Sequence, residues 1–259
     1  EEEIERLELL GTRKDAIRVT GDASFERALE RVDRARQASS ASGRRLSDRT
    51  PGRVRLCAGS TGPEDAGVLV EAMAVLTASR SSGADDDLEL ILVPHEPDAS
   101  ALKRIRELCV EHLGVEPRLW SDGPAPADGA SPGSGMPPPR VVDAVGFLAE
   151  RYLECDLAWV GGGIGGEGLH SVVEPAAAGL PVLFGPVYDR WEARQMVQKG
   201  IGLEVEPDLV PSILSGLAGD PGRRTDMGAE ARLYVESGRG ATEASARLVV
   251  GLLGEKPAT

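Results

Sequence analysis

The chain has 259 residues, of which 41% are hydrophobic and only 3% aromatic, and its formal net charge is −13. This length and apolar content predict a globular chain with a core of Ala, Val and Leu, in one large domain or one domain with appendages. The acidic balance argues against a general nucleic-acid surface, which needs clustered Lys and Arg, so no nucleic-acid partner is expected.

The first elements in chain order are predicted to be a helix, a strand and a second helix. Residues 2–10 form an amphipathic pattern that ends at Gly11. Ile17–Thr20 is predicted as a strand and Phe25–Arg36 as a charged helix. The chain begins with EEEIERLELLG, which is typical of the middle of a helix. We therefore expect residues 1–37 to be a linker, first strand and helix that continue from a missing N-terminal domain.

Strands and helices alternate in the rest of the chain. We predict strands at 54–58, 88–93, 117–120, 140–143, 157–160, 181–184 and 202–205, and helices at 63–79, 100–113, 146–155, 192–199 and 209–217, with two more between 221 and 253. The low complexity of residues 122–139 predicts a disordered loop. Continuous apolar strands that alternate with helices predict an α/β, Rossmann-like parallel sheet with helices on both faces. This domain is expected to span 38–253, with a tail at 254–259.

Residues 156–186 form the most informative stretch, a strand, glycine loop, helix and strand. Six glycines lie between Gly161 and Gly168, and His170-Ser171 is predicted to begin the helix. A glycine loop before a helix favours an anion site, because backbone N–H groups can approach the ligand and the helix N-terminus is partially positive. The loop is neither a dinucleotide fingerprint nor a Walker loop. A flexible surface turn is the alternative.

Polar or glycine-rich turns follow three of the predicted strands. These turns are Gly59-Ser60-Thr61, Pro94-His95-Glu96, and the stretch from Gly161 to His170. Ligands on parallel sheets bind at the carboxyl ends of the strands, near a topological switch point. The sequence therefore predicts that the three turns converge on one crevice.

Individual side chains in these turns have two interpretations each. His170 and Glu174 are four residues apart, on one helical face, and either bind phosphate and sugar hydroxyls or act as a helix cap and a dipole complement. His95 is either a ligand group or part of a solvated turn. Ser60 and Thr61 either bind phosphate or cap a helix.

The cysteines and histidines do not form a metal-binding pattern. Cys57, Cys109 and Cys155 are far apart and form no CxxC pair, and the histidines form no HxxxH. We expect no metal site, and reduced, partly buried thiols in a cytoplasmic protein. A catalytic thiol is the alternative.

Five segments together resemble the 3-deoxy-D-manno-octulosonic acid (Kdo) transferases, glycosyltransferase family 30. They are IRVTGDASFERAL, LCAGSTGPED, LILVPHEPD, VVDAVGFLAERYLECDLAWVGGG and VGGGIGGEGLHSVVEPAAAGLPVLFGP, in the family's order, between about residue 4 and about residue 205. This family transfers Kdo from CMP-Kdo to lipid A precursors in lipopolysaccharide biosynthesis. Its members are GT-B enzymes with two Rossmann-like domains.

The resemblance implies that this chain is the C-terminal, donor-binding domain of such an enzyme. The implied donor-binding residues are Ser60, Thr61, Pro94, His95, Glu96, Gly146, Gly162, Gly163, Gly166, Gly168, His170, Ser171 and Glu174. The general base is implied to lie in the missing acceptor domain, so no residue here is assigned as catalytic and the fragment is expected to be inactive. CMP-Kdo is the implied donor substrate, and no cofactor is expected. The missing part is also implied to contact the lipid A precursor and the inner face of the inner membrane.

Four positions depart from the family pattern. Ser171 replaces an Asn, Phe147 a Glu, Gly62 a His or Trp, and Ser24 a basic residue. Loss of the Asn and of the basic residue is expected to weaken contacts to phosphate or sugar. Two alternatives therefore stay open: a non-catalytic or degenerate nucleotide-sugar-binding module, and a GT-B transferase that uses a UDP-sugar.

Overall fold

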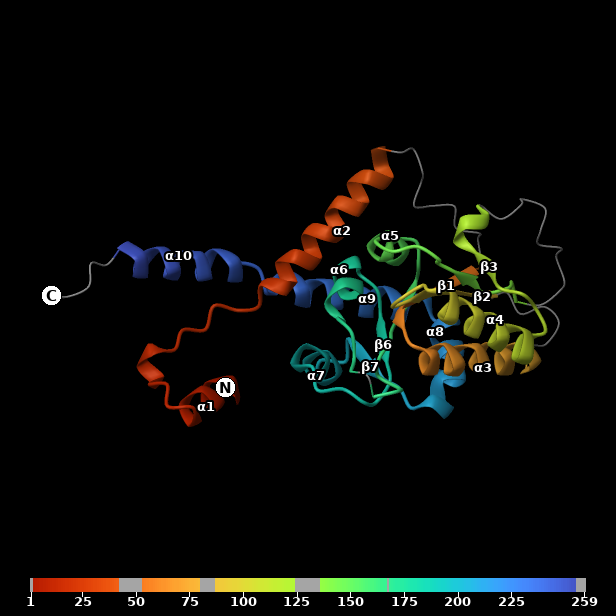
Figure 1. The fold of residues 1–259 in the computed structure, drawn as a ribbon, viewed down its shortest axis with the longest axis horizontal. Helices are drawn as coiled ribbons and strands as arrows, with labels where there is room; N and C mark the ends of the chain where they lie inside the picture. The colour runs from red at the N-terminus through yellow and green to blue at the C-terminus, as the bar shows by residue number, and fades with distance from the viewer. Residues whose placement is uncertain (1, 42–52, 80–86, 124–135, 167, 255–259) are drawn as a thin grey trace.

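The computed structural model describes residues 2–41, 53–79, 87–123, 136–166 and 168–254, and a seven-stranded parallel sheet lies at its centre (Figure 1). The strands are β1 (Arg53–Thr61), β2 (Asp87–Pro94), β3 (Arg118–Leu119), β4 (Arg140–Val141), β5 (Leu157–Val160), β6 (Val182–Phe184) and β7 (Gly202–Glu204). Their order across the sheet is β3-β4-β2-β1-β5-β6-β7. The chain runs outward from β1 on one side and then returns to β5 on the other, so the topological switch point lies between β1 and β5. The parallel, Rossmann-like sheet predicted from the sequence is confirmed.

Helices cover both faces of this sheet. One face carries α3 (Pro63–Ser79), α4 (Ala99–Leu113) and α8 (Val210–Ala218), and the other carries α2 (Ala23–Ala41), α5 (Leu148–Leu153) and α6 (Val173–Ala178). Two further helices, α7 (Trp191–Gln198) and α9 (Pro221–Ser237), pack against this second group. The remaining elements are α1 (Glu2–Leu9), α10 (Ala241–Gly254) and the short 3-10 turns η1 (Lys14–Ala16), η2 (Trp120–Asp122) and η3 (Pro207–Leu209).

Most residues of the central strands are apolar because both faces of the sheet are covered, and the charged Arg55 of β1 and Glu89 of β2 form an ion pair of 2.9 Å. In β1, Leu56 and Ala58 contribute to the core under α3 and α4, whereas Cys57 faces the core under α5. Successive side chains of a strand point to opposite faces, so each residue of a central strand needs an apolar neighbour. Trp159 in β5 is fully buried in the same way.

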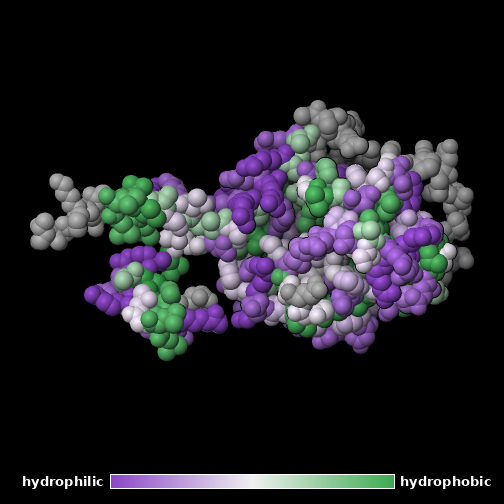
Figure 2. Space-filling model, in the orientation of Figure 1, coloured by the Kyte–Doolittle hydropathy of each residue, from purple (hydrophilic) through white to green (hydrophobic). Residues whose placement is uncertain are grey.

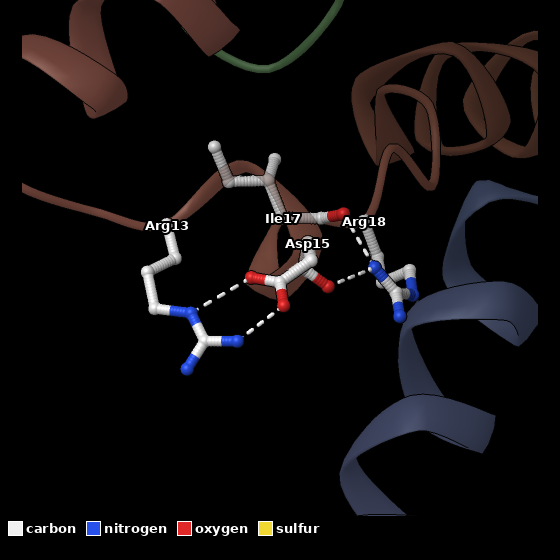
Figure 3. A network of polar contacts seen from close by, with 4 residues as sticks. All are labelled: Arg13, Asp15, Ile17 and Arg18. Atoms are coloured by element: carbon white, nitrogen blue, oxygen red, sulfur yellow. Dashed lines mark hydrogen bonds and ion pairs between the residues drawn. The ribbon is translucent and has the colours of Figure 1, made fainter.

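The strand predicted at Ile17–Thr20 is wrong, because these residues form an extended connection between η1 and α2. Arg13 Nε donates to Asp15 Oδ1 at 2.9 Å, and Arg18 Nη1 donates to the carbonyls of Asp15 and Ile17 at 2.7 and 2.9 Å (Figure 3). The Val19 side chain is 78% exposed. The apolar pattern is strand-like, but the contacts around it are local side-chain bonds rather than a ladder, and a strand needs a paired neighbour.

Helix α2 crosses the predicted boundary at residues 37–38 and packs into the core through Phe25, Leu29 and Val32. The division into 1–37, 38–253 and 254–259 stays a prediction. Within the predicted disordered loop, residues 124–135 lie outside the described residues, as do 255–259 of the tail. Residues 136–139 are placed against the sheet rather than disordered, because the Pro139 carbonyl accepts the Arg118 N–H at 2.9 Å and Met136 packs on the core.

The two terminal helices expose apolar side chains. Figure 2 shows apolar residues gathered on α1 and α10, which project from the rest of the molecule. The start of α10 is held by a bond of 2.9 Å between Ser245 and Thr20, while Leu253 near its end is 81% exposed. None of the helices in the described part of the chain has the length and apolarity that a membrane span requires.

Candidate functional site at the carboxyl ends of the central strands

Three loops meet at the carboxyl edge of the sheet, as the sequence predicted. They are residues 59–62 at the end of β1, 94–96 at the end of β2, and 161–166 with 168–171 after β5, and we call them the strand-end loops. β1 lies between β2 and β5 in the sheet. The Gly161 N–H donates to the Gly59 carbonyl at 2.9 Å, and the His95 N–H donates to the Thr61 carbonyl at 3.1 Å. The loop after β1 is therefore bonded to both of the others.

Asp65 joins the loops after β1 and β5 through its buried carboxylate. It stands in the first turn of α3 and is 1% exposed. Its Oδ1 accepts the indole N–H of Trp159 at 3.0 Å, and its Oδ2 accepts the backbone N–H groups of Gly162 at 2.8 Å and Gly62 at 3.3 Å. A buried carboxylate is costly unless it is hydrogen-bonded, so this arrangement holds both loops in one position.

The end of β1 is irregular at Ser60. The register between β1 and β2 shifts between Gly59 and Thr61, so Ser60 is a bulge, and its φ of 53° lies in the left-handed region. Such a conformation is strained for a residue other than glycine and is enriched at ligand sites. The neighbouring Thr61 is 4% exposed, and its Oγ1 is buried without a hydrogen-bond partner among the described residues.

The glycines of the loop after β5 fall into two groups. A side-chain carbon at Gly162, whose φ is 91°, would lie 2.2 Å from the Gly168 carbonyl oxygen, and one at Gly163 would lie 2.8 Å from the Gly185 nitrogen. Gly166 and Gly168 are exposed, and a carbon at either would meet no atom within 4 Å. The first pair therefore packs the loop against its neighbours, and the second pair leaves the backbone open to solvent.

The two histidines predicted at the site are in contact. The rings of His95 and His170 are stacked, with their centroids 4.3 Å apart and their planes at 27°. The prediction that a helix begins at His170-Ser171 is wrong, because α6 begins at Val173 and the His170 N–H donates to the Gly161 carbonyl at 3.0 Å. This hydrogen bond closes the glycine turn, and the helix begins only after it. Arg190, before α7, holds the same loop by donating to the Leu169 carbonyl.

Glu174 lies in α6 and is mostly buried. Its side chain is 14% exposed, and Arg31 of α2 reaches its Oε1 at 3.5 Å. Burial raises the pKa of the Tyr152 phenol well above its ordinary value, and the nearby Glu174 carboxylate acts in the same direction. A side-chain carbon at Gly59 would lie 2.1 Å from the Tyr152 hydroxyl, so Tyr152 connects the surroundings of Glu174 with the end of β1.

The other predicted site residues differ in how exposed they are. Pro94 is buried at the end of β2, whereas Glu96 and Ser171 are exposed. Gly146, with a φ of 92°, lies in the turn between β4 and α5. Of the four departures, Phe147 is half-exposed before α5, Gly62 donates to Asp65, and Ser24 lies in the first turn of α2.

Sequence reasoning missed the residues that hold the loops, mainly Asp65, Trp159 and Arg190. Asp65 falls inside the helix predicted at 63–79, and the helical pattern alone assigns it no further role. A Trp in a buried strand carries an indole N–H that needs an acceptor, and that was the available signal for a buried carboxylate nearby.

The thiols are buried, and the described residues contain no cluster for a metal. Cys57, Cys109 and Cys155 are buried and none of them forms a disulfide, and burial raises the pKa of Cys109 to about 11. Thiols in such surroundings are poor nucleophiles. The predicted burial is confirmed and is complete rather than partial, while the reduced state stays a prediction. Within the described ranges, no group of three or more His, Cys, Asp or Glu side chains is placed to hold a metal ion.

The curated relatives that match this chain share one name. The chain is 29% identical over 236 residues to 3-deoxy-D-manno-octulosonic acid transferase of Bordetella pertussis, a match that covers 88% of this chain and 50% of the relative. It is 25% identical over 189 residues to the protein of that name from Chlamydia trachomatis serovar A, covering 70% of this chain and 37% of the relative. The chain thus spans half or less of the length of these relatives. No family model matches it.

Two solved structures share the fold of this chain. The C-terminal CMP-Kdo binding domain of WaaA from Acinetobacter baumannii superposes with a TM-score of 0.58 at 19% identity, covering 80% of this chain and 98% of that one. WaaG, a glycosyltransferase involved in lipopolysaccharide biosynthesis, superposes with a TM-score of 0.50 at 16% identity, covering 84% of this chain and 50% of that one. The resemblance predicted from the motifs is confirmed: this chain is related to the 3-deoxy-D-manno-octulosonic acid transferases and has the fold of a GT-B C-terminal domain.

Proposed function

We propose that this chain binds CMP-Kdo as the donor half of a Kdo transferase that acts on a lipid A precursor in lipopolysaccharide biosynthesis. The observation that carries the proposal is the junction of the strand-end loops at the switch point, in a chain whose curated relatives are named Kdo transferase. Open α/β sheets bind their ligands at such a point.

In this proposal, two kinds of group hold the donor. The exposed backbone around Gly166 and Gly168 faces the phosphate, and Gly162 and Gly163 hold that turn against the rest of the protein. The Thr61 hydroxyl, together with the imidazoles of His95 and His170, provides polar contacts. Glu174 accepts hydroxyl groups of the sugar or the nucleoside.

The chemistry divides between this chain and a second domain. Negative charge develops on CMP as it leaves, and backbone N–H groups fixed at the phosphate lower the energy of that state. The general base that deprotonates the acceptor belongs to an N-terminal half, as do the acceptor site and the contact with the inner face of the inner membrane. The match to half or less of each curated relative supports this division. We propose that the chain alone is inactive and needs no metal or cofactor.

Calorimetry with CMP, UMP and UDP tests the donor assignment. We expect CMP to bind at least about tenfold more tightly than UMP or UDP, because the base distinguishes them, and this corresponds to about 1.4 kcal/mol. A preference for UDP would overturn the proposal in favour of a UDP-sugar transferase.

A non-catalytic module is the second candidate, and the departures at Ser171 and Phe147 favour it. Both side chains are at least partly exposed, so neither change is explained by packing. Joining the chain to the N-terminal half of the Bordetella pertussis relative distinguishes the two. Kdo transfer by the joined protein supports the enzyme, whereas CMP binding without transfer supports the module.

A further inference from the structure

Two of the three histidines of the chain stack on each other at the strand-end loops. His95 follows β2 and His170 follows the glycine turn after β5, and these strands flank β1 on opposite sides. The stack therefore spans the end of β1, with 4.3 Å between the ring centroids. The third histidine, His112, lies on α4, where its Nε2 is 3.8 Å from Glu71 Oε1.

Thr61 provides an independent observation at the same place. Its carbonyl accepts the His95 N–H at 3.1 Å, so its backbone is attached to one member of the stack. Its hydroxyl oxygen is buried and has no hydrogen-bond partner among the described residues. Buried hydroxyls are almost always satisfied, so this one marks either backbone strain at the end of β1 or a water, ion or ligand bound beside it.

Charged side chains in and beside the strand-end loops belong to four parts of the fold. Glu96 and Asp98, both exposed, follow β2, and Glu64 and Asp65 lie in the first turn of α3. Glu174 lies in α6, Arg190 precedes α7, and Glu192 lies in the first turn of α7. Asp65 is bonded to Trp159 and Gly162, and Glu174 is paired with Arg31. The Arg190 guanidinium donates hydrogen bonds to the Leu169 carbonyl and to the Glu192 carboxylate. Within the strand-end loops, His95 and His170 are the side chains that can carry a positive charge.

We propose that His95 and His170 form a proton-dependent clamp for the phosphodiester of the donor nucleotide. This inference rests on the proposed function. Protonation gives each imidazole a second N–H donor and a positive charge, and charge-assisted bonds to phosphate oxygens are stronger than neutral ones. Two stacked imidazolium rings repel each other unless an anion lies beside them, so protonation and phosphodiester binding favour each other, as linkage requires.

The sign of the pH dependence follows from this linkage. An imidazole changes charge between about pH 5 and 8, whereas a phosphodiester keeps one negative charge over that range. Binding is therefore tight at low pH and weakens as the pH rises and the imidazoles lose their protons. The pH dependence belongs to the protein and not to the ligand.

Cytidine 5′-(methyl phosphate), a phosphodiester that lacks the sugar, is a suitable probe. Calorimetry from about pH 5.5 to 8.5, in buffers of different ionisation enthalpy, gives both Kd and the number of protons taken up. We expect Kd to rise by at least about tenfold between pH 6 and pH 8, with net proton uptake in that range. We expect no proton uptake with cytidine, which has no phosphate.

Three single variants assign the effect. His95→Gln and His170→Gln are each expected to abolish proton uptake and to bind at pH 6 as weakly as the unchanged protein does at pH 8. His112→Gln is the matched control, because it removes a histidine from α4 and leaves the strand-end loops unchanged. It is expected to keep the full pH dependence.

Ring-proton NMR of the unchanged protein decides the question even if a variant fails to fold. The ring signals of His95 and His170 are expected to move when the probe is added at pH 6, and those of His112 are not. Binding without proton uptake would overturn the clamp and leave the proposed function standing. Proton uptake that persists in both His95→Gln and His170→Gln would do the same. Absence of nucleotide binding at every pH would overturn both.

Discussion

At the scale of single residues, Asp65 has the largest structural role at the site. One carboxylate accepts an indole N–H and two backbone N–H groups, and its donors come from β5, from the glycine loop and from the turn after β1. Hydrogen bonds to a charged group contribute about 1.5–3 kcal/mol each, and a donor left unsatisfied in the interior has a similar cost. The position of the loops therefore depends on this side chain.

Asp65→Asn is expected to lower the free energy of unfolding by about 2–4 kcal/mol, because an amide NH2 then faces a backbone N–H. Nucleotide binding is expected to weaken with it. Urea unfolding followed by Trp fluorescence measures the first effect and calorimetry the second. Asp220→Asn is the control: Asp220 caps α9 by accepting the Arg223 N–H at 2.8 Å, and Asn caps equally well. If both variants were as stable as the unchanged protein, Asp65 would not hold the loops.

At the scale of elements, the loop after β5 combines a packed part and an open part. Its composition predicted an anion-binding turn followed directly by a helix. The structure instead uses Gly162 and Gly163 for close packing and begins α6 only at Val173. Since α6 has only six residues, the proposed anion binding depends on the turn rather than on a long helix.

A pair of alanine variants separates the two parts of this loop. Gly166→Ala introduces only backbone strain at a φ of 77°, which has a cost of about 1–2 kcal/mol. Gly162→Ala adds a collision with the Gly168 carbonyl, so we expect a loss of about 3 kcal/mol or more. Guanidinium unfolding of both variants checks the difference. Equal losses would show that the loop adjusts freely and that Gly162 is not a packing position.

At the scale of the whole molecule, burial of aromatic hydroxyls makes stability sensitive to alkaline pH. Burial, together with a hydrogen bond of 2.6 Å to Glu204, raises the pKa of Tyr188 to about 12. Burial, with a smaller effect of Glu192, raises the pKa of Tyr234 to about 12. The pKa of Tyr152 is also raised well above its usual range, mainly by burial.

All three tyrosines of the chain are therefore expected to stay protonated in the folded state at pH values where they ionise in the unfolded state. The unfolded state loses its phenolic protons first, so stability is unchanged by these groups below about pH 10 and falls between about pH 10 and 12. A pH titration followed by the absorbance of phenolate near 295 nm measures the ionisation of the tyrosines in the folded protein, with denatured protein as the control. Ionisation of the folded protein near pH 10 would contradict the assignment.

The sequence by itself determined the parallel sheet, the order of its elements and the three strand ends that carry polar residues. These follow from local chemistry, because apolar runs that alternate with helical patterns have few other ways to bury their side chains. The motif resemblance to Kdo transferases was likewise readable without coordinates. The apolar run at Ile17–Thr20 misled the prediction, because a strand also depends on a neighbour.

Only the tertiary structure decided which polar groups the protein uses internally and which it leaves for a ligand. Trp159 and Asp65 are 94 residues apart, and their bond exists because the sheet places β5 beside β1. At the same edge of the sheet, Ser60 lies at a shift of register, the Thr61 hydroxyl has no partner among the described residues, and His95 stacks on His170. Hydrogen bonds between distant segments depend on strand order and register, and local patterns do not contain that information.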